Sequence, residues 1–173
     1  MSKLSVAELQ TRLSSVKLLA LDVDGVLTDG GLYYTDNGEE LKKFNVKDGQ
    51  GLKLLQQAGI EVAIISASNS PSTRYRAKKL AIDHVFLGVE DKLLVLKELC
   101  QTLELNLSQV AYVGDDVNDL PVLQLVGCPL TVADAIAANR AEAIYITQQA
   151  GGQGAVREIC DLIISIINHP EFT

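Results

Sequence analysis

Short, strongly apolar runs alternate along the chain with longer segments whose apolar positions recur every three or four residues. The first run, 17–21, shows no polar alternation, which is typical of a strand buried on both faces of a sheet. Further runs predict strands at 62–66, 84–87, 110–113, 129–132 and 144–146. The intervening segments predict helices at 5–13, 48–58, 70–80, 91–103, 118–125, 133–140 and 155–167. This order favours an α/β fold with a Rossmann-like three-layer architecture, in which helices cover both faces of a parallel sheet.

One excursion interrupts this alternation, at residues 31–44. Segments 32–34 and 40–44 flank Thr35-Asp36-Asn37-Gly38, and an Asn-Gly pair is a strong signal for a tight turn. We therefore expect a small β-hairpin insertion that serves as a lid or as an oligomer contact. Since the hairpin is too small for a second domain, residues 1–173 are expected to form one domain.

Polar residues mark the expected ends of several helices. Asp48, Ser70 and Asp134 are each expected to cap the helix that follows them. The segment Gly151-Gly152-x-Gly154 resembles a phosphate-cradling loop but lacks the lysine of a P-loop. We interpret it as a flexible stretch before the last helix, with a role at a subunit interface or at the mouth of the active site.

The charge of the chain limits its partners. Acidic residues outnumber basic residues by 22 to 15, which gives a formal net charge of −7. Such a charge disfavours nucleic acid and anionic membranes as partners. If the substrate is itself an anion, a metal ion or a local basic cluster has to reverse the field at the site.

The cysteines and the two ends of the chain indicate a reducing compartment. Cys100, Cys128 and Cys160 are far apart in apolar surroundings, which favours buried thiols over a disulfide framework or a zinc site. Residues 1–15 lack the apolar core of a signal peptide, and the apolar stretch 162–167 is too short to span a bilayer. We expect a cytoplasmic protein.

Polar side chains collect where the predicted strands end. Because the carboxyl ends of parallel strands meet at one edge of a sheet, we expect these groups to converge on a single crevice. They are Asp22 and Asp24 after the first strand, Ser66 at the end of the second, Lys92 after the third, and Asp115, Asp116 and Asp119 after the fourth.

The residue types at these positions suit phosphoryl transfer. Asp22 and Asp115, with the backbone carbonyl of Asp24, offer the oxygen ligands that Mg²⁺ prefers. Asp22 is a suitable nucleophile, since the acyl phosphate that it forms is readily hydrolysed. Asp24 is suited to protonate the leaving alkoxide and then to deprotonate the attacking water.

Ser66 and Lys92 offer a hydroxyl donor and a point charge for phosphoryl oxygens. Asp116 and Asp119 are expected to orient Lys92 or a metal-bound water. Taken singly, these residues have simpler interpretations: Asp-x-Asp-Gly as a turn, Lys92 as a solvated lysine and Asp116 as a helix cap. Their presence together at matching strand ends favours the catalytic interpretation.

The four motifs resemble those of the haloacid dehalogenase phosphatase superfamily: Asp22-x-Asp24-Gly-Val-x-Thr28, Ser66, Lys92 and Gly114-Asp115-Asp116-x-x-Asp119. Over nearly the whole chain, further segments look like the 3-deoxy-D-manno-octulosonate 8-phosphate phosphatases, among them Asn37-Gly-Glu-Glu, Phe44-Asn-Val-Lys-Asp-Gly49 and Gly151-Gly-x-Gly-Ala-Val-Arg-Glu158. The resemblance implies a haloacid dehalogenase-like core without a large cap domain. It implies a homotetramer built around the hairpins, in which a neighbouring subunit helps to close each site. It also implies Mg²⁺-dependent hydrolysis of that sugar phosphate through an aspartyl-phosphate, in lipopolysaccharide precursor synthesis.

One motif departs from the family pattern. Where the family usually reads Ser/Thr-Gly-Arg, this chain reads Ser66-Ala67-Ser68-Asn69. The missing arginine would be expected to contact the phosphate or the sugar carboxylate, and Arg74, Arg76 and Arg157 are candidates to replace it. This departure keeps open a phosphatase for another keto-deoxy sugar such as a nonulosonate 9-phosphate. A second alternative, of another class, is a catalytically silent phosphate-binding module.

Overall fold

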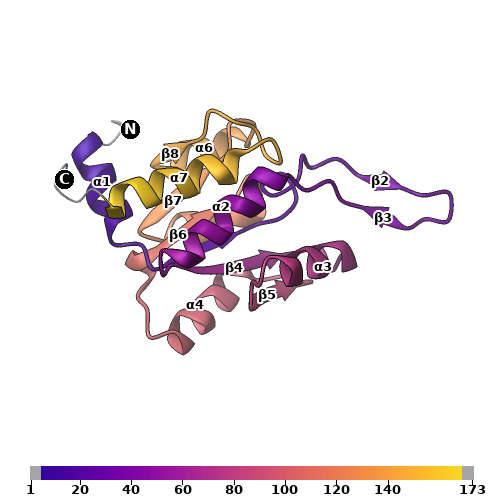
Figure 1. Cartoon of the computed structure of the whole chain (residues 1–173), viewed down its shortest axis with the longest axis horizontal. Coiled ribbons are helices and arrows are strands. Elements are labelled where there is room, and N and C mark those ends of the chain that lie inside the picture. Colours follow the sequence, from indigo (N-terminus) through magenta and orange to yellow (C-terminus); the bar gives the residue numbers. More distant parts are fainter. Residues whose placement is uncertain (1–4, 169–173) are drawn as a thin grey trace.

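Six parallel strands form the central sheet of the molecule, in the order β5-β4-β1-β6-β7-β8 (Figure 1). The computed structural model describes residues 5–168. The predicted α/β architecture with a parallel sheet is confirmed. The strands are β1 (Leu18–Leu21), β4 (Glu61–Ser66), β5 (His84–Leu87), β6 (Val110–Val113), β7 (Cys128–Thr131) and β8 (Tyr145–Ile146).

Helices cover both faces of this sheet because successive strand residues point to opposite sides. In β1, Leu19 and Leu21 join one apolar core, whereas Leu18 and Ala20 join the other. The first core is completed by α1 (Val6–Ser14), α2 (Val46–Gln57), α3 (Pro71–Lys79) and α7 (Ala155–Asn168). The second is completed by α4 (Lys92–Thr102) and α5 (Leu120–Leu123), while α6 (Ala137–Glu142) lies before β8. In the described range 5–168, no helix is both long and apolar enough to cross a bilayer.

The expected hairpin lies between β1 and α2 and extends away from the body of the molecule (Figure 1). Its strands β2 (Tyr33–Tyr34) and β3 (Glu40–Leu41) pair antiparallel. Gly38 adopts a φ of +80°, which a glycine reaches without steric cost and which closes the turn.

Asp48 was predicted to cap α2, and this prediction is wrong. The N-cap is Asn45, whose side chain accepts the N–H of Lys47 at 2.8 Å. Asp48 lies one turn further on and is 1% exposed, and its Oδ1 accepts the N–H of Arg157 at 2.8 Å. Asp48 therefore caps α7, a helix more than a hundred residues away, whose first turn has unpaired N–H groups.

Two predicted helices begin later than expected. The helix predicted at 118–125 is a 3₁₀ turn, Val117–Asp119, followed by α5, because the carboxylate of Asp119 turns back onto the N–H groups of Asp115 and Asp116. The helix predicted at 133–140 is α6, which starts at Ala137. Asp134 does not cap it, since its Oδ1 accepts the N–H of Gly151 at 2.9 Å.

The glycine-rich segment at 151–154 was predicted to be flexible, and this prediction is wrong because the segment is closely packed. Gly151 and Gly152 are buried, and the N–H of Gly152 donates to the carbonyl of Val26 at 3.0 Å. A Cβ on Gly151 would lie 1.7 Å from the carbonyl oxygen of Gly25. Only glycine permits this approach, so the segment braces the loop that follows β1.

Replacing Asp48 with alanine is expected to lower the free energy of unfolding by about 1–3 kcal/mol, because the N–H of Arg157 loses its acceptor inside the protein. Urea denaturation measures this loss. The matched control is Asp161→Ala, which removes an exposed i,i+4 ion pair of 2.8 Å to the same Arg157. That variant should lose no more than about 0.5 kcal/mol. Equal losses in the two variants would contradict capping by Asp48.

Candidate active site

The predicted site residues meet at the carboxyl ends of β1, β4 and β6. The chain passes from β1 to β4 on one side and later returns to β6 on the other, and such a reversal of strand order is where open α/β sheets bind ligands. Carboxylate oxygens of Asp22, Asp115 and Asp119 lie within 4.8 Å of one another. The predicted convergence of these three residues is thus observed.

Lys92 joins the carboxylates from the first turn of α4. Its Nζ lies 3.0 Å from Asp22 Oδ1 and 2.7 Å from Asp119 Oδ1, and its side chain is 1% exposed. Burial alone would lower the pKa of Lys92, but the charges of Asp22 and Asp119 outweigh burial and raise it. Lys92 is therefore a fixed cation inside the cluster.

Asp119 is fully buried, and several donors surround it. Besides Lys92, the hydroxyl of Tyr112 donates to Oδ1 at 2.6 Å, and the N–H groups of Asp115 and Asp116 donate to Oδ2 at 3.0 and 3.3 Å. With its oxygens so occupied, Asp119 acts as a support for Lys92 and for the Asp115 backbone. Tyr112 was not predicted to take part, although a buried tyrosine hydroxyl usually requires a partner.

The pKa values of Asp22 and Asp115 are raised, so their ionised forms are disfavoured in the site. Burial, with the neighbouring charge of Asp119, raises the pKa of Asp22 to about 6. Burial, followed by the charges of Asp22 and Asp119, raises the pKa of Asp115 to about 7. These shifts mean that the two carboxylates lack a compensating positive charge beyond Lys92.

The surroundings of Asp115 fit a divalent cation. Its Oδ1 is buried and has no hydrogen-bond partner among residues 5–168. Gly25 has a φ of +84°, and a Cβ there would lie 2.1 Å from Asp115 Oδ2. The glycine thus lets the Asp115 carboxylate lie against the loop after β1, and a carboxylate oxygen of Asp22 lies within 4.8 Å of one of Asp115. This donor set of hard oxygens suits Mg²⁺.

Asp24 lies at the rim of the site and is held by the hairpin. Its side chain is 38% exposed, and its Oδ1 is ion-paired with the ammonium group of Lys42. The Nζ of Lys42 also lies 3.2 Å from Glu40 Oε1, and the side chain of Lys42 is 3% exposed. Sequence reasoning did not identify Lys42, because a lysine in a polar hairpin is normally solvated.

Ser66 and Asp116 differ in how close they come to the cluster. Ser66 is 1% exposed at the end of β4, beside β1, and its Oγ accepts the N–H of Ser68 at 3.2 Å. Asp116 is exposed and caps the 3₁₀ turn through the N–H of Val117 at 2.7 Å. In the part of the chain that the structure describes, Asp119 but not Asp116 contacts Lys92.

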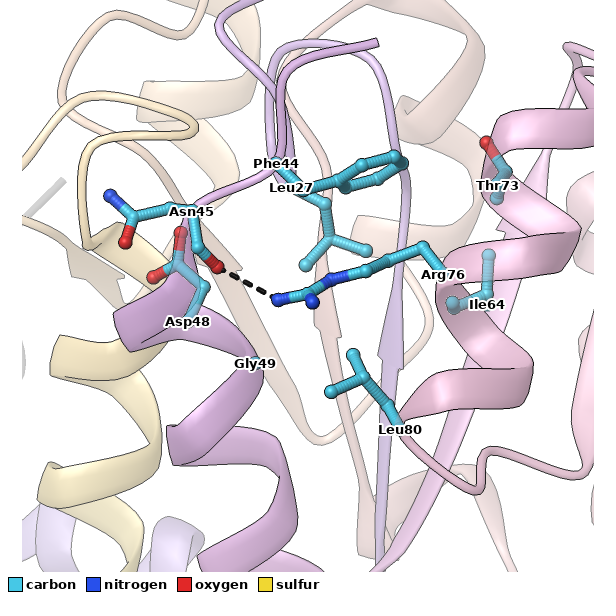
Figure 2. A pocket seen from close by; sticks show the side chains of 9 residues that line it. All are labelled: Leu27, Phe44, Asn45, Asp48, Gly49, Ile64, Thr73, Arg76 and Leu80. Atoms are coloured by element: carbon cyan, nitrogen blue, oxygen red, sulfur yellow. Dashed lines mark hydrogen bonds between the residues drawn. The ribbon is translucent and has the colours of Figure 1, made fainter.

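The candidate arginines point elsewhere in this subunit. Arg74 is exposed on α3, and Arg157 is paired with Asp161 on α7 at 2.8 Å. Figure 2 shows the guanidinium of Arg76 reaching from α3 to the first turn of α2, where it donates to the carbonyl of Asn45 at 3.0 Å. In that small pocket, it also lies 5.9 Å from the ring centroid of Phe44. Among the described residues, none of the three arginines forms an ion pair with Asp22 or Asp115.

A larger hollow opens between the hairpin and the loop after β4. It has a volume of about 540 Å³ and is lined by Glu40 on one side and by Ser68 and Asn69 on the other. Its size suits a small organic ligand. Ser68 stands where the family pattern has an arginine, and Asn69 follows it, so this wall offers neutral hydrogen-bonding groups.

Comparisons of the sequence agree with the geometry. Residues 46–127 match the family model of haloacid dehalogenase-like hydrolases. The 3-deoxy-D-manno-octulosonate 8-phosphate phosphatase KdsC of Yersinia pestis is 46% identical over 153 residues, which cover 88% of this chain and 82% of the relative. The enzyme of the same name from Escherichia coli K12 is 44% identical over 91% of this chain and 84% of its own length.

Solved structures show the same fold throughout. A 3-deoxy-D-manno-octulosonate 8-phosphate phosphatase from Moraxella catarrhalis, in complex with magnesium, phosphate and KDO, superposes with a TM-score of 0.93 at 41% identity and covers 97% of each chain. A probable YrbI family phosphatase from Pseudomonas syringae gives a TM-score of 0.92 at 48% identity, covering 96% of this chain and 94% of that one. The chain therefore belongs to the 3-deoxy-D-manno-octulosonate 8-phosphate phosphatase family, within the haloacid dehalogenase-like hydrolases.

Proposed function

We propose that this chain hydrolyses 3-deoxy-D-manno-octulosonate 8-phosphate to the free sugar acid and inorganic phosphate. The observation that carries the proposal is the buried cluster in which Asp22 lies 3.0 Å from Lys92 and within 4.8 Å of Asp115, in a chain 46% identical to a phosphatase of that name. The resemblance further supports one domain over residues 1–173 and a role in cytoplasmic synthesis of lipopolysaccharide precursors.

The reaction takes two steps in this geometry. A carboxylate oxygen of Asp22 attacks phosphorus, the bond from phosphorus to the sugar oxygen breaks, and the carboxyl group of Asp24 gives its proton to the leaving alkoxide. Asp24 then takes a proton from water as the water oxygen attacks the aspartyl-phosphate. The bond from phosphorus to Asp22 breaks, inorganic phosphate leaves, and both aspartates return to their starting state.

Lys92 and Ser66 are proposed to bind the phosphoryl oxygens. Lys92 is already fixed by Asp22 and Asp119, so its charge needs no reorganisation when negative charge develops on phosphorus. Ser66 offers a hydroxyl from the adjacent strand, and Asp119 holds Lys92 in place. Arg74 and Arg157 are proposed to bind the phosphate or the sugar carboxylate, and Asp116 is proposed to orient a metal-bound water.

Asp22, Asp115 and the backbone carbonyl of Asp24 are proposed to hold Mg²⁺, supported by the unpartnered Oδ1 of Asp115. When bound, the ion would neutralise charge on the carboxylates and the phosphoryl group. The magnesium in the Moraxella catarrhalis phosphatase structure supports this assignment.

A second candidate substrate follows from the neutral wall formed by Ser68 and Asn69. A longer keto-deoxy sugar, such as a nonulosonate 9-phosphate, would place more hydroxyl groups along this wall of the hollow. Comparing kcat/KM on the two sugar phosphates decides between them, and an equal or greater value on the longer sugar would overturn the first choice.

Changing Asp22 to asparagine is expected to reduce phosphate release by at least about 10³-fold, because the amide cannot form the acyl phosphate. The melting temperature should not fall, since one of the crowded carboxylates is removed. Asp83→Asn, at an exposed loop position before β5, is the matched control and should keep the wild-type rate. Undiminished release from Asp22→Asn would exclude Asp22 as the nucleophile. No release from the wild type with Mg²⁺ would favour the silent phosphate-binding module.

Stability should depend on pH and Mg²⁺ together. In the metal-free fold the pKa values of Asp22 and Asp115 are about 6 and about 7, whereas in the unfolded chain both are near 3.8. The stability of the metal-free fold therefore falls as pH rises from about 4 to about 7. Added Mg²⁺ is therefore expected to raise the melting temperature more at about pH 8 than at about pH 5.5, where protons compete for the same oxygens. Thermal melts with Mg²⁺ or a chelator measure the difference. Asp115→Asn should abolish the Mg²⁺ shift and Asp83→Asn should keep it; a shift that is equal at both pH values would contradict the assignment.

The hairpin is proposed to hold a homotetramer together. Leu32, Tyr34, Leu41 and Val46 are 52–80% exposed along the hairpin and its base, which is an unusually apolar surface for a projecting element. Sedimentation is expected to show an oligomer, and Leu41→Asp should shift it toward monomer. Leu125→Asp, at a leucine that is 51% exposed after α5, should leave it unchanged. Sedimentation of the wild type as a monomer would contradict the proposal.

A further inference from the structure

The side chain of Lys42 is buried although the hairpin that carries it projects from the molecule. The residues from β3 onward alternate: Leu41 is 52% exposed and the side chain of Lys43 is 57% exposed, whereas that of Lys42 is 3% exposed. A lysine this buried requires ionic partners. It has two, Asp24 and Glu40, so its ammonium group lies between a carboxylate of the loop after β1 and one of its own strand.

Asp24 depends on this contact for its orientation. It lies in an irregular segment, and within residues 5–168 its carboxylate forms no other ion pair or hydrogen bond. Lys42 engages Oδ1 and leaves Oδ2 without a hydrogen bond in the described part of the chain. Proton transfer to a leaving oxygen requires the donor oxygen to be held within hydrogen-bond reach, and a freely rotating carboxyl group meets this condition only part of the time.

We infer that Lys42 is a positioning residue for this reaction: it donates to Oδ1 of Asp24, so that Oδ2, the oxygen that carries the transferred proton, is presented to the leaving group. The inference rests on the proposed function, in which Asp24 transfers the proton. It makes the hairpin a working part of the active site of its own subunit, in addition to any contact with a neighbour.

The neighbouring lysine provides a contrast within the same hairpin. Lys43 is also paired with an aspartate, Asp29, at 2.8 Å, but its side chain is 57% exposed and faces away from Asp24 in the strand alternation. An exposed pair of this kind contributes little to stability. Lys43→Met therefore removes a hairpin lysine and an ion pair without touching Asp24, which makes it the matched control.

The test uses the leaving group, because a primary alkoxide needs a proton to depart and p-nitrophenolate does not. The value of kcat/KM reports all steps up to departure of the leaving group, so it excludes hydrolysis of the aspartyl-phosphate. With saturating Mg²⁺, we expect Lys42→Met to lower kcat/KM on 3-deoxy-D-manno-octulosonate 8-phosphate by about 10- to 100-fold, mainly through kcat. On p-nitrophenyl phosphate the same variant should lose less than about threefold. Lys42→Arg should recover most of the activity on the sugar phosphate, and Lys43→Met should resemble the wild type on both substrates.

Asp24→Asn separates failure of this inference from failure of the proposed function. If Asp24→Asn is selectively impaired on the sugar phosphate but Lys42→Met is impaired equally on both substrates, Lys42 supports only the fold and the inference is overturned. A rise in KM with unchanged kcat in Lys42→Met would make Lys42 a substrate ligand instead, which also overturns it. If Asp24→Asn shows no dependence on the leaving group, Asp24 is not the proton donor and both fail. Should Lys42→Met be insoluble, Lys42→Ser is the second variant, since its side chain is polar but too short to reach Asp24. It should be impaired on the sugar phosphate and not on p-nitrophenyl phosphate, and a wild-type ratio between the two substrates would overturn the inference.

Discussion

One ammonium group placed between two carboxylates, with almost no water around it, is the constraint on which the active site depends. Lys92 contacts Asp22 and Asp119, and all three side chains are at most 7% exposed. Removing Lys92 would typically cost about 3–5 kcal/mol, because the charges of Asp22 and Asp119 would stay buried without compensation. Lys92 therefore cannot be substituted without a loss of stability. The cluster also fixes the relative positions of the three elements that carry it: the first turn of α4, the end of β1 and the 3₁₀ turn after β6.

The positive charge of this cluster does not balance its negative charge. Three carboxylates with one lysine leave a net negative centre in the interior, and the raised pKa values of Asp22 and Asp115 express that deficit. A divalent cation held by Asp22 and Asp115 would remove this deficit, and the site would then no longer repel a phosphate dianion. The acidic composition of the chain is therefore compatible with an anionic substrate, because Lys92 and such a cation would reverse the field locally.

The fold and the central site could be predicted from the sequence because their signals are local. Apolar runs that end in Asp22, Ser66 and Asp115 identify parallel strands and the edge where they meet. The errors concern residues whose partners are chosen by tertiary contact. Asp48 and Asp134 have the composition of caps for the next helix, yet each accepts an N–H group from a distant segment. Tyr112 lies within an apolar run, so its hydroxyl was expected to belong to the core. The burial of the Lys42 side chain depends on the tertiary contact between the hairpin and the loop after β1.

The contact between Gly151 and Gly25 has a consequence for how far the chain can vary outside its catalytic motifs. A Cβ on Gly151 would lie 1.7 Å from the carbonyl oxygen of Gly25, and Gly152 donates its N–H to the carbonyl of Val26. Any side chain at position 151 would therefore displace the loop that carries Asp22 and Asp24, although the two segments are more than a hundred residues apart. The position of the catalytic carboxylates thus depends on a backbone contact with a segment that carries no catalytic group.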